Sequence, residues 1–300
     1  MKKILLLLVV ALTLTACHQN ENQQGQPEPK KVIVPPGMPV APIPESVSET
    51  QLPITIDPNP TPSNPDAPVL QIEEGKPLDL SPLMGQSKSL GEQVAAKLDT
   101  VRVKAEQGHA DYQYLYGASF EYGWGVDADD KQAMTWYKRA ADQKQKASYN
   151  AVGNLYRLGK GVKADPKEAF RWFQLGADAD DAQAMLNVGN CYYYGMGVTK
   201  DVAQAVEWWQ RSADGDNAYA QSQMGDCYFY GLGVQQNMDK AAEYYTKAID
   251  ANISSAQYRL AMLYYYGQGV NADRTYAKLL LQKARDGGMR EAQDFLEKNY

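Results

Sequence analysis

The sequence has few of the residues that build metal centres, disulfide frameworks and nucleic-acid-binding surfaces. Its 300 residues include two histidines and three cysteines, which excludes a His-rich metal site and a disulfide scaffold. The formal net charge is −6, and residues 91–300 hold 27 acidic and 24 basic side chains. This region has no basic field for nucleic acid. We therefore expect no nucleic acid, metal or cofactor, and we look for function in surfaces.

Proline is scarce everywhere except in one stretch. Fifteen of the 16 prolines lie between Pro27 and Pro82. Residues 18–90 are also rich in Gln, Asn, Glu and Ser and contain no aromatic side chain. Such a composition buries too little apolar surface to offset the entropy of ordering the chain. We predict that residues 17–90 form a disordered tether and that the folded part begins at residue 91.

The first 16 residues have the pattern of a secretory signal. Two lysines precede an apolar run of eleven residues, 4–14, which is too short to span a bilayer as a helix. The signal ends in Leu-Thr-Ala followed by Cys17, which resembles the lipobox of bacterial lipoproteins. The resemblance implies a diacylglycerol on Cys17, and His18 implies sorting to the outer membrane in a Gram-negative host. An ordinary cleavage site beside a chance cysteine is the alternative.

From residue 109 onward, a Gly-x-Gly-Val motif recurs five times at a spacing of 36 residues. The motifs begin at Gly123, Gly159, Gly195, Gly231 and Gly267. A small residue precedes each motif by six positions: Gly117, Gly153, Gly189, Gly225 and Ala261. An aromatic residue stands 13 positions after the first glycine of four motifs: Trp136, Trp172, Trp208 and Tyr244. The fifth motif has Leu280 at this position. One Gly-x-Gly is a weak signal, but five in phase predict a repeat protein.

Each 36-residue unit predicts two helices. The first ends at the glycine pair, because a left-handed terminal residue is best without a Cβ. The second begins after a residue type that caps free N–H groups: Asp129, Asp165, Asp201, Asn237 and Asp273. We predict an all-α protein with five helix-turn-helix repeats over 109–288, an N-terminal capping helix over 91–108 and a C-terminal capping helix over 289–300.

These residues resemble the Sel1-like repeat family, whose members are relatives of the tetratricopeptide repeats. The resemblance covers 109–288 and implies a right-handed α-solenoid. Repeats two to four fit best. The fifth departs, with Ala261 for glycine and Leu280 for tryptophan, as expected of a unit beside the polar end of a stack.

One face of each first helix is the candidate binding surface. Residues at −6, −3, +1, +4 and +5 from Gly117 and its equivalents share a narrow stripe, and the core stripe lies opposite. By resemblance to tetratricopeptide arrays, this stripe lines a concave groove for a protein or peptide, where an asparagine bonds the peptide. The candidate partner-binding residues are Asn154, Arg157, Asn190, Tyr193, Tyr194, Asp226, Phe229, Tyr230, Tyr265 and Tyr266. The alternative is that the tyrosines only pack between neighbouring first helices.

An enzymatic function is a further alternative, because some cysteine-rich Sel1-like proteins bind or hydrolyse β-lactams. Cys191 and Cys227 occupy equivalent positions in successive repeats, roughly 10 Å apart when stacked, which is too far for a disulfide. No Ser-x-x-Lys motif or Gly-x-Ser-x-Gly elbow is present, and we assign no catalytic residue. We expect a non-catalytic, lipid-anchored interaction scaffold of the cell envelope, at the outer membrane and facing the periplasm if the host is Gram-negative. A surface-exposed factor that binds a host protein is the third hypothesis.

Overall fold

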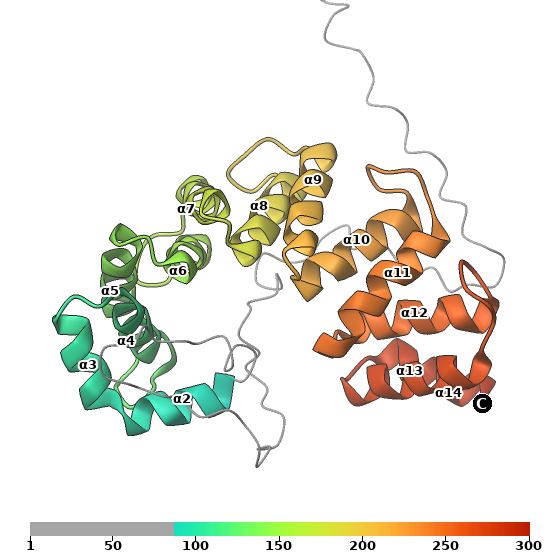
Figure 1. Cartoon of the computed structure of the whole chain (residues 1–300), viewed down its shortest axis with the longest axis horizontal. Helices are drawn as coiled ribbons and strands as arrows, with labels where there is room; N and C mark the ends of the chain where they lie inside the picture. Colours follow the sequence, from blue (N-terminus) through green and yellow to red (C-terminus); the bar gives the residue numbers. More distant parts are fainter. Residues whose placement is uncertain (1–86) are drawn as a thin grey trace, which may run out of the picture. The chain divides into compact units, whose positions relative to one another are not determined.

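The computed structural model describes residues 87–300, and these form thirteen α-helices and one 3₁₀ turn (Ile249–Ala251) without a strand. Ten of the α-helices pair into five hairpins, each with a first and a second helix. The hairpins are α4 (Ala110–Tyr122) with α5 (Asp130–Asp142), α6 (Lys146–Leu158) with α7 (Pro166–Asp178), α8 (Ala182–Tyr194) with α9 (Val202–Asp214), α10 (Ala218–Tyr230) with α11 (Met238–Ala248), and α12 (Ser254–Tyr266) with α13 (Arg274–Asp286). Figure 1 shows them stacked in chain order. The predicted signal, Cys17 and most of the tether lie outside the described residues.

Helices also flank the five hairpins. Helix α14 (Arg290–Asn299) follows α13 and packs on it. Upstream, where the sequence predicts one helix over 91–108, the structure has two, α2 (Ser87–Ala96) and α3 (Leu98–Glu106). The chain leaves helical geometry at Lys97 (φ −115°, ψ 17°). Both helices then pack on α4, and Gly91 of α2 lies against the indole of Trp124, in the turn that follows α4.

The Gly-x-Gly turn ends each first helix and also brings neighbouring hairpins together. Helix α8 ends at Gly195, whose φ of 73° is left-handed as predicted. The Asp201 amide then donates to the Tyr192 carbonyl at 2.9 Å, which closes the turn. The second glycine, Gly197, lies so close to α7 that a Cβ would overlap the Pro166 carbonyl. Both glycines are left-handed and so serve the turn, and the second also permits contact between repeats.

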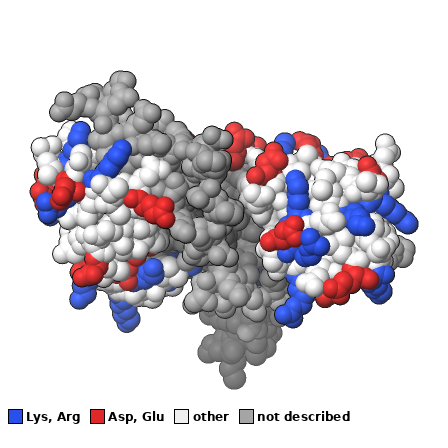
Figure 2. Space-filling view, turned by 90° about the horizontal axis from the view of Figure 1, so that it is seen from below, with Lys and Arg blue, Asp and Glu red and all other residues white. Residues whose placement is uncertain are grey.

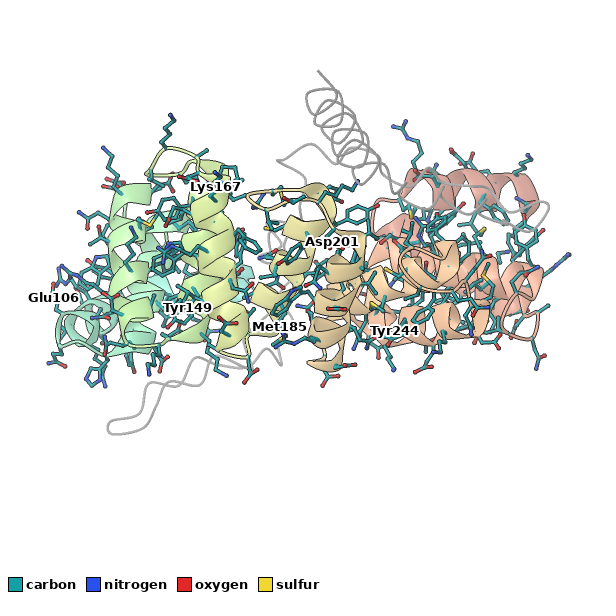
Figure 3. All side chains as sticks on the ribbon, turned by 90° about the horizontal axis from the view of Figure 1, so that it is seen from above. Glu106, Tyr149, Lys167, Met185, Asp201 and Tyr244 are labelled. Carbon is teal, nitrogen blue, oxygen red and sulfur yellow. The ribbon has the colours of Figure 1, made fainter. Side chains whose placement is uncertain are left out.

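The predicted N-caps are confirmed in all five hairpins. The Asp201 carboxylate accepts hydrogen bonds from the amides of Ala203 (2.9 Å) and Gln204 (3.1 Å) at the start of α9. Asp129, Asp165, Asn237 and Asp273 cap their helices through the same side-chain oxygen. Figure 3 shows Lys167 and Asp201, at the starts of second helices, at one edge of the stack, and Tyr149 and Met185, from first helices, toward the other.

A notch in each first helix receives a large side chain of its second helix. A Cβ at Gly153 would lie 2.5 Å from Cε1 of the Phe173 ring. The same arrangement joins Gly117 to Tyr137, Gly189 to Trp209 and Gly225 to Tyr245. In the fifth hairpin both equivalent positions change, to Ala261 and Leu281, and both side chains are buried. The predicted close crossing at the small residues is confirmed, and it depends on a matched pair.

The turns from a second helix to the next first helix contain a feature that the sequence analysis does not predict. One residue in each turn is left-handed: Lys144 (φ 66°), Asp180 (φ 57°), Asp216 (φ 59°) and Asn252 (φ 55°). Gly108 and Gly288 hold the same place at the two ends of the array. Four of these six residues are not glycine, so the residue type at these positions does not predict the left-handed conformation.

Candidate functional site

Consecutive first helices contact one another, α6 with α8 and α10 with α12. The predicted stripe lies on these first helices. We call the stripe residues of α4, α6, α8, α10 and α12 the first-helix face. The opposite, core stripe is confirmed, because its members are buried: Tyr116, Val152, Val188, Met224 and Leu260.

The open polar part of the first-helix face lies between α6 and α8. Asn154 and Arg157 of α6 are both half-buried, and Arg157 Nε donates to Asn154 Oδ1 at 3.3 Å. An amide pair joins the two helices, because Asn187 Nδ2 donates to Asn150 Oδ1 at 2.6 Å. The helices thus present amide and guanidinium groups side by side, which suits hydrogen bonding to a peptide.

Two tyrosines at the end of α8 lie on the same face, beside the Asp226 carboxylate of α10. Tyr193 and Tyr194 are half-buried and meet edge to face, with ring centroids 4.9 Å apart and an interplanar angle of 90°. Tyr193 also packs on Trp209 (5.2 Å), and Lys200 Nζ lies 5.4 Å from its ring centroid. Burial raises the pKa of both tyrosines, so both hydroxyls remain protonated at neutral pH. We call Asn154, Arg157, Tyr193 and Tyr194 the α6–α8 site.

Asn190 is held by the protein itself. Its side chain is 3 % exposed, and its Oδ1 accepts a hydrogen bond from Trp209 Nε1 at 3.1 Å. The notch at Gly189 brings this indole onto α8. The side-chain oxygen of Asn190 therefore makes a hydrogen bond inside the protein core. In repeat two the equivalent aromatic residue is Phe173, which has no polar group, so Asn154 keeps its place on the face without such a bond.

In repeats four and five the candidate residues form an internal network. Asp226 Oδ1 accepts from the Tyr245 hydroxyl at 2.6 Å and lies 2.8 Å from Arg259 Nε. Arg259 of α12 also donates through Nη1 to the Tyr230 hydroxyl. Burial disfavours the charge of Arg259, but the Asp226 carboxylate beside it keeps the pKa of the guanidinium above its ordinary value. These charges hold α10, α11 and α12 together.

The aromatic stripe is less open here than the sequence suggests. Phe229 and Tyr230 are 6 % and 5 % exposed, because α12 packs against α10. Tyr265 and Tyr266 stay half-buried, and Tyr265 meets Phe295 of α14 edge to face at 5.0 Å. Phe229 and Tyr230 therefore pack between neighbouring first helices and expose little surface to a ligand.

Sequence reasoning did not select Glu121, although it lies on the first-helix face in α4. Its side chain is 7 % exposed; it accepts from the Tyr137 hydroxyl at 2.8 Å and lies 3.8 Å from Lys160 Nζ. Burial raises the pKa of Glu121, and the Tyr137 hydrogen bond and the Lys160 charge oppose that shift. Arg259 was also missed, because it lies outside the stripe positions and reaches the network from the side.

Two cysteines lie in the described part of the chain, and neither is a ready nucleophile. Cys191 and Cys227 are both unpaired and buried. Burial raises the pKa of Cys191 to about 12, and it raises the pKa of Cys227 as well, so neither is a thiolate nucleophile at neutral pH. Within 87–300 no group of three His, Cys, Asp or Glu side chains could hold a metal ion. No helix in that range is long and apolar enough to cross a bilayer.

Charge is distributed evenly over the visible surface. Figure 2 shows lysine and arginine interspersed with aspartate and glutamate on the face that it presents, without a broad patch of one sign. This pattern agrees with the nearly balanced charge of residues 91–300.

The repeats match a known family. The sequence profile of the Sel1 repeat matches residues 110–144, 146–181, 182–217, 218–253 and 254–289. Among solved structures, a Sel1 repeat protein from Oxalobacter formigenes is 30 % identical, with a TM-score of 0.61 over 64 % of this chain and 79 % of that one. Among curated proteins no relative was found.

A second solved structure comes from uropathogenic Escherichia coli, where it is a protective antigen with an SLR fold. It is 34 % identical, with a TM-score of 0.60 over 71 % of this chain. This chain spans 44 % of the length of that protein, so it corresponds to only part of it. Sel1 repeat proteins are generally protein-interaction scaffolds, and their fold is typically non-catalytic. The five matched repeats and these two structures show that the chain belongs to the Sel1 repeat family.

Proposed function

We propose that this protein is a non-catalytic scaffold of the bacterial cell envelope that binds a partner protein or peptide through the concave, first-helix face. The α6–α8 site carries this proposal. Its four side chains are half-buried, so they combine contact area with access to solvent. The equivalent polar residues Asn190 and Asp226 are instead bonded to core aromatic side chains.

The chemistry of the α6–α8 site suits an extended peptide. Asn154 and Arg157 provide amide and guanidinium donors for backbone or side-chain oxygens of the peptide. Tyr193 and Tyr194 provide large rings with few rotatable bonds, so little entropy is lost when a peptide packs on them.

The anchor is part of the same proposal. A diacylglycerol on Cys17 would hold the repeats at a membrane, and in a Gram-negative host His18 favours the outer membrane with the repeats facing the periplasm. A second candidate is a factor exposed on the cell surface that binds a host protein. One observation favours it: the E. coli relative is a protective antigen. The two candidates differ in the side of the membrane, not in the binding surface.

Photo-crosslinking in cells tests the binding surface. A benzophenone amino acid replaces Tyr194 in one strain and Glu207, which is exposed on α9, in a matched control. We expect the probe at 194 to give a discrete crosslinked partner and the probe at 207 to give none. A partner captured only from position 207 would place the interaction on the second helices and overturn the proposal.

A further inference from the structure

One motif of the chain has no part in the proposed binding surface. Asn252-Ile253-Ser254 matches Asn-x-Ser/Thr, the acceptor of N-linked glycans, in which x is any residue except proline. Of the thirteen asparagines in the chain, only Asn59 has the same spacing to a hydroxyl, and Pro60 disqualifies it. The chain therefore has a single acceptor of this type.

The residue two positions before the asparagine also fits. Bacterial transferases that attach N-linked glycans select an acidic residue at that place, and Asp250 holds it. Asp250 and Asn252 are both exposed. Residues 250–254 thus combine the acid, the amide and the hydroxyl at the spacing of a bacterial acceptor.

The structure places Asn252 in a surface turn. It follows the 3₁₀ turn Ile249–Ala251 and precedes α12, so it joins the fourth hairpin to the fifth (Figure 1). Its φ of 55° is left-handed, a conformation that asparagine adopts more readily than most residues. An N-linked glycan requires such a turn, because the attached sugar is bulky and hydrated.

The side-chain amide of Asn252 is available for reaction. It is exposed, and it makes no hydrogen bond to any residue that the structure describes. Other asparagines of the stack are engaged, since Asn217 and Asn237 cap helices and Asn187 donates to Asn150. Asn252 therefore has no role in holding the hairpins together that a modification would disrupt.

The equivalent turns between hairpins lack the acceptor. Their left-handed residues are Lys144, Asp180 and Asp216. No hydroxyl follows at the required distance, because the residues two positions later are Lys146, Ala182 and Ala218. The turn at Asn252 also differs in shape: α11 has 11 residues and continues into the 3₁₀ turn, whereas the other second helices have 13. The acceptor thus coincides with a local departure from the repeat.

The fold indicates when the acceptor can react. Ile253 is 9 % exposed, and Ser254 begins α12, where its Oγ donates to the Gly287 carbonyl at 3.3 Å. A transferase binds the asparagine and the hydroxyl together in an extended segment, so it must act before the fifth hairpin closes. Export supplies that moment, because a secreted chain crosses the membrane before it folds. The finished fold accommodates the sugar, because Asn252 itself is exposed.

We propose that Asn252 is an N-glycosylation site whose donor is an oligosaccharide on a polyprenyl diphosphate carrier. Asn252 Nδ2 attacks the anomeric carbon of the first sugar, a C–N bond forms, and the bond from that carbon to the diphosphate oxygen breaks. The carrier diphosphate leaves, and the amide gives up one proton to a base of the transferase. The inference requires export of the repeats, as the proposed function does, but it does not involve the first-helix face.

The glycan and the first-helix face are separated along the helix. Asn252 lies at the start of α12, and Tyr265 and Tyr266 lie at its end. Thirteen helical residues span about 20 Å. The sugar is therefore attached at the edge where first helices begin, away from the tyrosines at their ends.

Mass spectrometry of the protein made by its native host tests the site. The full chain is purified and digested with trypsin, which cleaves after Lys247 and Arg259 and releases residues 248–259 as one peptide. We expect most copies of this peptide to carry a glycan on Asn252. Recovery of the unmodified peptide alone overturns the inference. Capture of a partner from position 194 would then still support the proposed function.

Four variants made in the same host separate Asn252 from its neighbours. Asn252→Gln and Ser254→Ala each remove one part of the acceptor, and both should lose the glycan while keeping the helical circular dichroism of the unchanged protein. Ser254→Thr should keep the glycan, because threonine also supplies the hydroxyl. Ser255→Ala is the matched control in the same peptide and should keep it too. A glycan that survives Asn252→Gln, or that is lost with Ser255→Ala, would assign the sugar to a serine and contradict the inference.

Discussion

Lys144 shows how a single backbone angle affects stability. Its φ of 66° is left-handed, which costs a side-chain-bearing residue about 1–2 kcal/mol, whereas Gly108 and Gly288 hold the equivalent places without that cost. The greater entropy of glycine in the unfolded chain offsets part of the gain. We expect Lys144→Gly to raise the free energy of unfolding by about 0.5–1 kcal/mol in urea denaturation. Lys146→Gly, at the start of α6, is the control and should lower it. A loss of stability in both variants would contradict this account.

Glu121 predicts a pH dependence whose sign follows from burial. Burial raises the pKa of Glu121 in the folded state, so the folded protein binds more protons than the unfolded chain just above the ordinary pKa of glutamate. The stability contributed by this group is present below that pKa and is lost as pH rises through the raised value. Glu121→Gln keeps an acceptor for the Tyr137 hydroxyl and removes the buried charge.

We expect Glu121→Gln to melt at a higher temperature than the unchanged protein near neutral pH, with the difference shrinking toward about pH 4. Circular dichroism melts across this range measure it. Glu243→Gln is the control, because Lys247 lowers the pKa of Glu243 and the sign of the effect reverses. A less stable Glu121→Gln at neutral pH would mean that the contact with Lys160 outweighs the cost of burial.

At the scale of the helix pair, the notch at Gly153 makes two residues interdependent. A methyl group at Gly153 collides with Phe173, and Phe173→Leu leaves a gap, so each single change should cost about 1–3 kcal/mol. The fifth hairpin already holds alanine with leucine at these positions. We expect the double variant Gly153→Ala, Phe173→Leu to be about 1 kcal/mol more stable than the sum of the singles implies. Additive losses in urea unfolding would show that the pair is not coupled.

The helix ends were predictable from the sequence, and the openness of the site was not. Gly195 and Asp201 act through their own backbone and side chain within one turn, so their residue types are sufficient. The burial of Phe229 depends on α12, the first helix of the next hairpin, and the hydrogen bond of Asn190 depends on which aromatic residue fills the notch. Such contacts join residues that are far apart along the chain, so no pattern in the neighbouring sequence predicts them.

At the scale of the whole molecule, one sulfur carries the proposed membrane anchor. We expect Cys17→Ser to abolish incorporation of labelled palmitate and to release the protein from the membrane fraction, because the remaining chain has no other predicted lipid attachment. His18→Asp is the matched control and should still incorporate the label. Equal labelling of the Cys17→Ser variant would remove the lipid anchor from the account.

The central claim is that the first-helix face is the binding surface, and the affinity of the crosslinked partner tests it most directly. The triple variant Asn154→Ala, Arg157→Ala, Tyr194→Ala changes half-buried groups on that face, and Glu207→Ala with Lys247→Ala changes exposed groups on the second helices. Truncating a central aromatic or arginine contact commonly costs about 2 kcal/mol, or roughly thirtyfold in Kd. Isothermal titration should therefore show at least that loss for the triple variant, with little change in its melting temperature, and unchanged binding for the control. A triple variant that stays folded and binds the partner as tightly as the unchanged protein would contradict the claim.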